Sequence, residues 1–272
     1  MRGVSRTSHA EAAERLEALL DRTPDAGARE RLGTELFAVV DLLDSSVPLR
    51  RALTDPSRDG EAKAGLLGRL LQGKVSSDAA DLLAGAARSR WSAAHDLADS
   101  VEILAVDTVL AAAEASDRLD RTEEEVHRAG QLLTADQGVR SALLERRAST
   151  RAKSDLVGRL VGGTAPETST LVRRMASNPR GRRPEAAFEF VTQAAARRRQ
   201  RLVAHVTVAA WPTEEQQQRL AAALTQKYSR QVRLAIDVDP SVLGGMRVQI
   251  GDDVIDGTVH RRLDEATEQL GR

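Results

Sequence analysis

The apolar positions of roughly the first two hundred residues recur at a spacing of three or four residues, which is the period of an α-helix. Leu97, Val101 and Leu104 share one helix face in this way. The sequence Asn178-Pro-Arg-Gly181 interrupts the pattern with a turn, and a further helix is expected from about Pro184 toward Arg199. These segments predict compact bundles of helices joined by short loops.

Three capping boxes mark expected helix starts. In such a box a Thr hydroxyl accepts from the amide three residues on, and a Glu or Gln at that position accepts from the Thr amide. The pairs are Thr122 with Glu125, Thr164 with Glu167, and Thr213 with Gln216. Helices are therefore expected to begin at these places, the second with a proline in its first turn.

From residue 201 the apolar positions alternate, which is the period of a strand. Strands are expected at about 204–210, 232–238 and 246–250, with a helix after Thr213 between the first two. Gly251-Asp252 has the spacing of a tight hairpin turn that leads into a short strand, and Gly257-Thr258 begins a last helix. This order of strands and helices indicates a small α+β domain.

Two segments of the helical part align ninety residues apart. Leu49-Arg-Arg-Ala-Leu53 matches Val139-Arg-Ser-Ala-Leu143, and Leu66-Leu-Gly-Arg-Leu70 matches Leu156-Val-Gly-Arg-Leu160. Convergent helix patterning could inflate the match, but it does not readily supply the same Gly-Arg spacing. The match indicates an internal duplication.

The expected fold class is therefore mainly α, with two tandem helical-bundle repeats followed by a small α+β C-terminal domain. The first repeat is assigned to residues 1–105 and the second to residues 106–200. The C-terminal domain is assigned to residues 201–272.

Composition limits the chemistry open to this chain. It has 272 residues, 40 acidic and 40 basic side chains, and no cysteine. A zero net charge argues against a dedicated nucleic-acid binder, and the lack of cysteine excludes disulfides and thiolate sites. The start lacks the apolar core of a signal peptide, and no run approaches the roughly eighteen apolar residues of a membrane span. Neither secretion nor direct membrane insertion is expected.

No constellation of residues points to catalysis, a cofactor or a metal. The histidines are dispersed, and the glycines of 244–251 fit neither the dinucleotide-binding nor the P-loop pattern. The acidic residues of 239–256 lack EF-hand spacing and suit turns and caps. We therefore expect no catalytic, cofactor-binding or metal-binding residue. The histidines are His9, His95, His127, His205 and His260.

Two basic clusters keep another class of function open. Arg180-Gly-Arg-Arg183 and Arg197-Arg-Arg-Gln-Arg201 lack interleaved aromatic residues for base stacking. The first interpretation is a solvated helix end, where cations complement the helix dipole. The second is a landing site for an acidic partner, and the third is a nucleic-acid site.

The stretch from Asp239 to Thr258 combines a proline turn, a glycine pair, a hairpin and a helix start. Continued to Leu263, it resembles the signature of the ATP synthase delta subunit family, also called the oligomycin-sensitivity-conferral protein family. Thr258 stands where Ser is usual, and Gly245 is expected at positive φ. The motif residues with structural roles are Asp239, Pro240, Gly244, Gly245, Gly251, Ile255, Asp256, Gly257 and Thr258.

The helical part carries a less specific resemblance. Leu171-Val-Arg-Arg-Met-Ala-Ser-Asn178 is similar to a Leu-rich helix of the family's N-terminal domain, with Ser177 in place of Glu and Pro179 before Arg180. The resemblance thus covers about 106–272. Residues 1–105 look like an additional copy of the helical domain, as in the long delta subunits of actinobacteria.

The resemblance implies a non-catalytic peripheral-stalk (stator) subunit of an F-type, proton-translocating ATP synthase. In the family the helical domain binds the alpha (and beta) subunits of the head. The C-terminal domain binds the membrane-anchored b subunit, so that the head resists rotor torque. A peripheral place on the cytoplasmic face of the cell membrane is implied, with no cofactor and no nucleic acid.

The alternative is a helical scaffold, or a basic-patch nucleic-acid-binding adaptor, unrelated to ATP synthase. The sequence leaves open which repeat contacts the alpha subunits. It also leaves open whether b is separate, fused or doubled, and how the domains are oriented.

Overall fold

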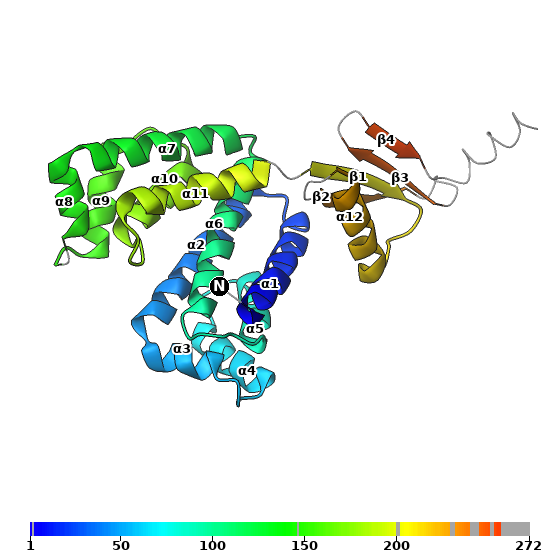
Figure 1. Cartoon of the computed structure of the whole chain (residues 1–272), viewed down its shortest axis with the longest axis horizontal. Coiled ribbons are helices and arrows are strands. Elements are labelled where there is room, and N and C mark those ends of the chain that lie inside the picture. The colour runs from blue at the N-terminus through cyan, green and yellow to red at the C-terminus, as the bar shows by residue number, and fades with distance from the viewer. Residues whose placement is uncertain are drawn as a thin grey trace, which may run out of the picture. The chain divides into compact units, whose positions relative to one another are not determined.

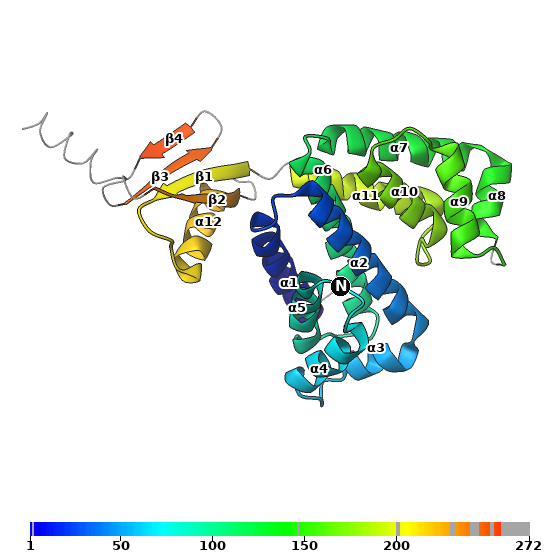
Figure 2. The same ribbon diagram turned by 180° about the vertical axis from the view of Figure 1, so that it is seen from behind.

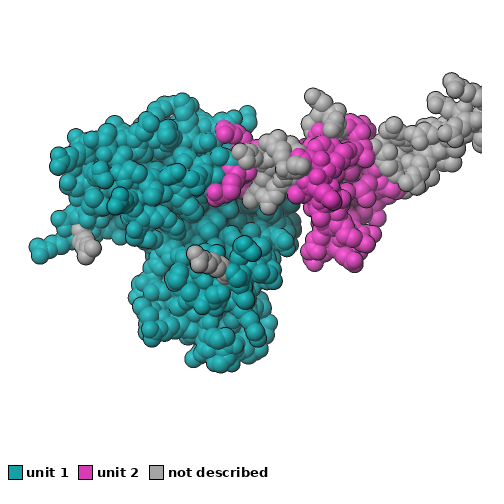
Figure 3. Space-filling model, viewed as in Figure 1, with its two compact units in different colours: residues 1–196 teal, residues 197–272 magenta. Residues whose placement is uncertain are grey.

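The computed structural model describes residues 1, 3–145, 147–199, 202–228, 232–239, 245–250 and 253–256. The chain divides into two compact units, Met1–Ala196 and Arg197–Arg272, which are coloured separately in Figure 3. Each unit has a hydrophobic core of its own. The chain is mainly helical, with a four-stranded sheet in the second unit, and this confirms the expected fold class.

Helices occupy the chain up to the first strand (Figure 1). The expected break before the last of them is a turn with Arg180 at φ 52° and Gly181 at φ 80°. α11 (Pro184–Arg199) then begins and ends where the apolar pattern predicts. The preceding helices are α1 (Val4–Asp21), α2 (Ala26–Ser45), α3 (Val47–Thr54), α4 (Gly60–Leu71), α5 (Ser77–Arg88), α6 (Asp96–Ala115), α7 (Leu119–Ala135), α8 (Gln137–Leu144), α9 (Thr150–Leu160) and α10 (Pro166–Ser177).

α6 is the central helix of the first unit. In Figures 1 and 2 it runs from the group α1–α5 to the group α7–α11. It is buried over most of its circumference, and the one half-buried face carries Asp99, Ile103 and Asp107. Its buried apolar residues are Leu97, Ala98, Val101, Leu104, Ala105, Val106, Val109, Leu110, Ala111, Ala112 and Ala113.

The helices before and after α6 correspond to one another. α3 and α8 begin ninety residues apart, and each starts with a side-chain cap, from Ser46 and from Asp136. Gly73 and Gly163 follow α4 and α9 at φ 69° and φ 82°. The expected boundary at 105/106 falls inside α6, and one hydrophobic core extends across both groups. The division into two helical domains therefore stays a prediction.

The capping box at Thr213 forms as expected. The Thr213 amide donates to Gln216 Oε1 at 2.8 Å, and the Gln216 amide donates to Thr213 Oγ1 at 3.3 Å. α12 (Glu214–Tyr228) begins at the next residue. Both partners are exposed, so no tertiary contact competes with the local pattern.

The expected helix start at Thr122 is wrong. α7 begins at Leu119, so Thr122 lies inside the helix with its side chain buried. Glu125 does not reach back to the Thr122 amide. Its Oε2 accepts from the Ala165 amide at 3.0 Å and from the Thr168 hydroxyl at 2.7 Å. The Glu125 carboxylate, which the local pattern predicts as a cap of α7, therefore bonds to the start of α10 instead.

The expected capping box at Thr164 is also wrong. α10 begins at Pro166, with the proline in its first turn as expected, but its N-cap is Ala165. The Thr164 hydroxyl donates to a carbonyl of the preceding turn. Glu167 forms an ion pair with Arg118 at the start of α7. The start of α10 is thus satisfied from α7, not from its own sequence.

The second unit holds β1 (Leu202–Val208), α12, β2 (Val232–Val238), β3 (Met246–Ile250) and β4 (Asp253–Asp256). The sheet order is β2-β1-β3-β4, with β1 and β2 parallel and the other pairs antiparallel. α12 supplies the crossover that a parallel pair requires and packs on the sheet through Leu224. The expected last helix from Gly257-Thr258 lies outside the described residues.

Gly33 sets how closely α2 approaches α6. A Cβ built there would lie 2.5 Å from Val109 Cγ2 and 3.3 Å from the Ala105 carbonyl oxygen. We expect Gly33→Ala to lower the free energy of unfolding by about 1–3 kcal/mol, because overpacking forces the helices apart. Urea denaturation of the full chain measures the change.

Gly68→Ala in α4 is the matched control, since a Cβ at Gly68 meets no atom within 4 Å. This variant should be neutral, or should gain up to about 1 kcal/mol from helix propensity. Equal destabilisation by both substitutions would show that close approach at Gly33 is not the cause.

Candidate protein–protein interface

The described residues of the C-terminal motif shape the backbone. The Asp239 amide donates to the Val208 carbonyl at 2.9 Å, and Gly245 has φ 84°, in the positive region expected for it. Ile255 pairs with Val248, and Asp256 lies in the same strand β4. Ile250 pairs with Asp253, which is the register of the expected tight hairpin. Pro240, Gly244, Gly251, Gly257 and Thr258 lie outside the described residues.

An apolar groove opens in the second unit where β1 and β2 end and β3 begins. It encloses about 590 Å³ between this end of the sheet and the first turns of α12. Its polar residues, Gln216, Gln217 and Arg219, come from α12. The other lining residues are Val206, Val208, Ala209, Ala210, Trp211, Pro212, Leu220, Leu234, Ile236, Gly245 and Met246.

Three large apolar side chains at this end of the sheet are exposed. Trp211 is 66% exposed, and Val238 and Met246 are exposed as well. Val238 and Met246 both pair with Val208, one on each side, so they lie close together in the sheet. An exposed apolar patch with a polar rim is typical of a protein interaction site.

Trp211 is a candidate interface residue that no motif of the sequence marks. Its sequence position could have marked it, because it is one of only 2 tryptophans in the chain and stands directly before Pro212 and a capping box. Its exposure depends on how the ends of β1 and β2 and the start of β3 are arranged in space, and local sequence patterns do not predict that arrangement. The C-terminal motif contributes Gly245 to the groove, so the motif and the groove meet there.

In the basic cluster at 180–183, Arg180 and Arg182 are held by carboxylates, which corrects the first interpretation for these two, whereas Arg183 is exposed. The Arg180 side chain is 9% exposed and faces three carboxylates. Its Nε donates to Asp44 at 2.6 Å, its Nη1 donates to Glu102 at 2.9 Å, and its Nη2 lies 2.9 Å from Asp99. Arg182 also donates twice to Glu102, at 2.9 Å and 2.7 Å. Arg180 and Arg182 thus belong to an internal ion-pair network.

The carboxylates around Arg180 determine its charge state. Burial by itself lowers the pKa of Arg180, but the hydrogen bond to Asp44 and the charges of Glu102 and Asp44 outweigh it and raise the pKa. The guanidinium therefore stays charged and is engaged within the first unit. It is not presented to the phosphates of a nucleic acid. In the second basic cluster Arg198 is buried, so that cluster is only partly solvated.

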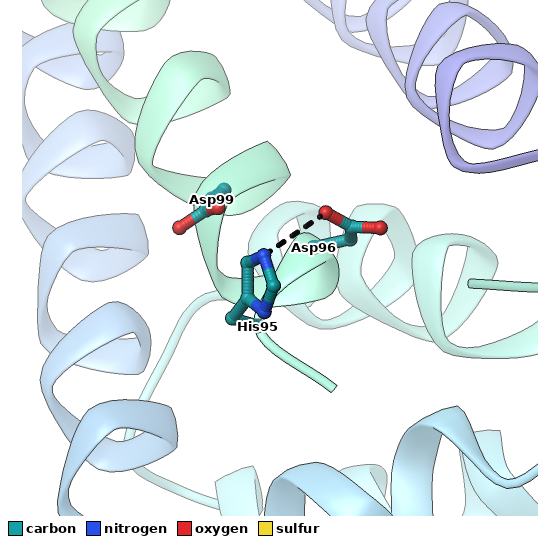
Figure 4. Close-up of side chains that lie close together, drawn as sticks. All are labelled: His95, Asp96 and Asp99. Atoms are coloured by element: carbon teal, nitrogen blue, oxygen red, sulfur yellow. Dashed lines mark ion pairs between the residues drawn. The ribbon is translucent and has the colours of Figure 1, made fainter. Parts of the chain in front are cut away.

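His95, Asp96 and Asp99 lie close together at the start of α6 (Figure 4). His95 Nε2 is 3.6 Å from Asp96 Oδ1. Asp96 is buried and accepts from the Ser5 hydroxyl at 2.6 Å, and Asp99 is paired with Arg180. Both carboxylates also lie in the first turn of α6, where they complement the helix dipole. These contacts give the cluster a structural role.

The other described histidines are separated. His9 shares a hydrogen bond with Ser100 at 2.9 Å, and burial lowers its pKa. His127 contacts Gln131 on the surface of α7, and His205 lies in β1. His260 lies outside the described residues. Within the described part of the chain, no helix is both long and apolar enough to cross a membrane.

Comparison with known proteins identifies the family. Residues 106–270 match the family model described as ATP synthase delta (OSCP) subunit. The ATP synthase subunit delta of Streptomyces griseus is 47% identical over 99% of both chains. That of Streptomyces coelicolor is 48% identical over 99% of this chain and 98% of its own, and that of Kineococcus radiotolerans is 45% identical over 98% and 97%.

Among solved structures, a chain of the Toxoplasma gondii mitochondrial ATP synthase hexamer is 23% identical. It covers 61% of this chain and 95% of its own at a TM-score of 0.28, which is too low to support a structural argument. The match to the family model and the identity to full-length relatives are sufficient to assign the family. The chain belongs to the ATP synthase delta (OSCP) subunit family.

Proposed function

We propose that this chain is a non-catalytic stator subunit of the peripheral stalk in an F-type, proton-translocating ATP synthase. It links the alpha (and beta) subunits of the catalytic head to the membrane-anchored b subunit at the cytoplasmic face of the cell membrane. Family membership supports this proposal. The observation that carries it is the exposed apolar groove beside Trp211, in a unit whose core is separate from that of the helices.

The groove suits the b subunit as a partner. An amphipathic helix can lay its apolar face into a groove of this kind, with anchors three or four residues apart. Trp211 is the most exposed large apolar residue of the described chain and supplies the aromatic anchor. Gln216, Gln217 and Arg219 supply a polar rim. Of the motif residues, Gly245 lines the groove, and the Asp239 amide ties the end of β2 to the end of β1 beside it.

The second repeat suits the head. Its surface carries exposed leucines on three successive helices: Leu132 on α7, Leu144 on α8 and Leu160 on α9. The equivalent positions ninety residues earlier, Leu42, Thr54 and Leu70, are buried or half-buried. The second repeat is also the one that the family model covers.

The alternatives have less support. A nucleic-acid-binding adaptor would need free cationic groups, but Arg180 and Arg182 are bonded to carboxylates of the same unit. A scaffold unrelated to ATP synthase is opposed by family membership. Affinity purification of the tagged chain from membranes should recover the alpha, beta and b subunits together, and recovery of none of them would reject the proposal.

Trp211→Ala should weaken binding to a purified C-terminal segment of b about thirtyfold, since losing an aromatic anchor costs about 2 kcal/mol. Isothermal titration calorimetry measures the affinity. Val254→Ala is the matched control, an exposed apolar residue on β4 that does not line the groove. Unchanged affinity in Trp211→Ala, with b still bound, would reject the groove as the b site.

Leu144→Asp should reduce binding to isolated alpha–beta heads at least tenfold, because an unpaired charge in an apolar contact costs more than about 1.4 kcal/mol. Leu144 is 53% exposed, so the fold should tolerate the change. Val47→Asp, at a residue 47% exposed on α3 of the first repeat, is the control. Loss of binding in the control alone would assign the head contact to the first repeat.

A further inference from the structure

We infer that the helical unit is one cooperative body, in which the two repeats unfold together and no hinge lies between them. The ninety-residue correspondence assigns α1–α6 to the first repeat and α6–α11 to the second. The two repeats therefore overlap in α6. This property goes beyond the proposed stator role, because a stator could equally be built from two domains on a flexible linker.

α6 fills two places in the repeat pattern. It is the last helix of the first repeat, where it packs along α2. It is also the first helix of the second repeat, where Val106 and Leu110 stand ninety residues after Leu16 and Leu20 of α1. All four side chains are buried. One helix thus contributes to two sets of contacts within a single continuous core.

Polar contacts also join the repeats. Arg180, from the turn between α10 and α11, is held by Asp44 of α2 and Glu102 of α6. Arg174 of α10 donates to Asp41 of α2 at 2.7 Å. Glu102 is 0% exposed, so moving the second repeat away would leave a buried carboxylate without its cations. An uncompensated buried charge is strongly destabilising.

The outer faces of the end helices are polar. α1 exposes Arg6, Glu11 and Glu14, and α11 exposes Glu185 and Glu189. In stacked repeats, polar outer faces mark the ends of the array. The apolar faces of α1 and α11 both belong to the one hydrophobic core of the helical unit. The cooperative body ends at α1 on one side and at α11 on the other.

Unfolding measured by local probes tests this inference in the full chain. Trp91 is buried in the first repeat, and its indole donates to the Ala86 carbonyl at 2.9 Å. With Trp211→Phe as background, Trp91 fluorescence reports the first repeat alone, since the chain has 2 tryptophans. Hydrogen exchange of the α9 amides reports the second repeat.

Three core truncations supply the comparison. Val157→Ala removes volume from α9 in the second repeat, and Leu67→Ala does the same at the position ninety residues earlier in α4. Leu224→Ala alters the separate core of the second unit. Val157→Ala and Leu67→Ala should both lower the urea midpoint of Trp91 fluorescence and should both speed exchange in α9. Leu224→Ala should leave both readouts unchanged.

Two results would overturn the inference. One is an unchanged Trp91 midpoint in Val157→Ala while the α9 amides exchange faster, because the repeats would then unfold separately. The other is a Trp91 shift of equal size in Leu224→Ala, because cooperativity would then extend beyond the helical unit. Neither result depends on any partner subunit, so the stator proposal stands or falls separately.

Discussion

The helical unit depends on one constraint: α6 must be apolar over most of its circumference, because helices pack against most of it. Its two neighbourhoods, α1–α5 and α7–α11, each need a buried face from it. The polar side chains that α6 buries are each hydrogen-bonded, and Asp96 accepts from the Ser5 hydroxyl. Ser100 shares a hydrogen bond with His9, and the Thr108 hydroxyl donates to the Leu104 carbonyl. Glu102 accepts hydrogen bonds from two arginines, Arg180 and Arg182.

This arrangement suits a part that carries a sideways load. A bundle whose halves share a helix cannot bend between them without breaking packed contacts, and dense cores transmit strain with little compression. The second unit is different, since its core of strand and α12 residues is separate. Under the proposed stator function, the helical unit would supply a stiff support and the second unit a separate docking surface, the groove beside Trp211. Because the two cores are separate, a substitution in the groove should leave the core of the helical unit unaltered.

The sequence predicts the elements well where local rules act alone. The strands and α11 follow from periodicity, and the cap of α12 follows from two exposed side chains, Thr213 and Gln216. It fails where a distant partner competes. Glu125 was expected to cap α7, but the start of α10 offers it an amide and a hydroxyl. Arg180 looked solvated because its carboxylates lie far back in the chain. The groove could not be predicted, because it exists only where the ends of β1, β2 and β3 meet.

The ion-pair network at Arg180 needs an explanation other than stability. Buried charge pairs often stabilise a fold no more than apolar residues of the same size would. What they add is geometry: the nitrogens of Arg180 face carboxylates of Asp44, Glu102 and Asp99, and Asp44 accepts from two of them. If the contact were apolar, the α10–α11 turn could shift along α6 at little cost. With the ion pairs, the same shift would leave the buried Glu102 carboxylate without its arginine partners. We therefore interpret the network as the device that fixes the register between the repeats, while α6 supplies the binding energy that holds them together.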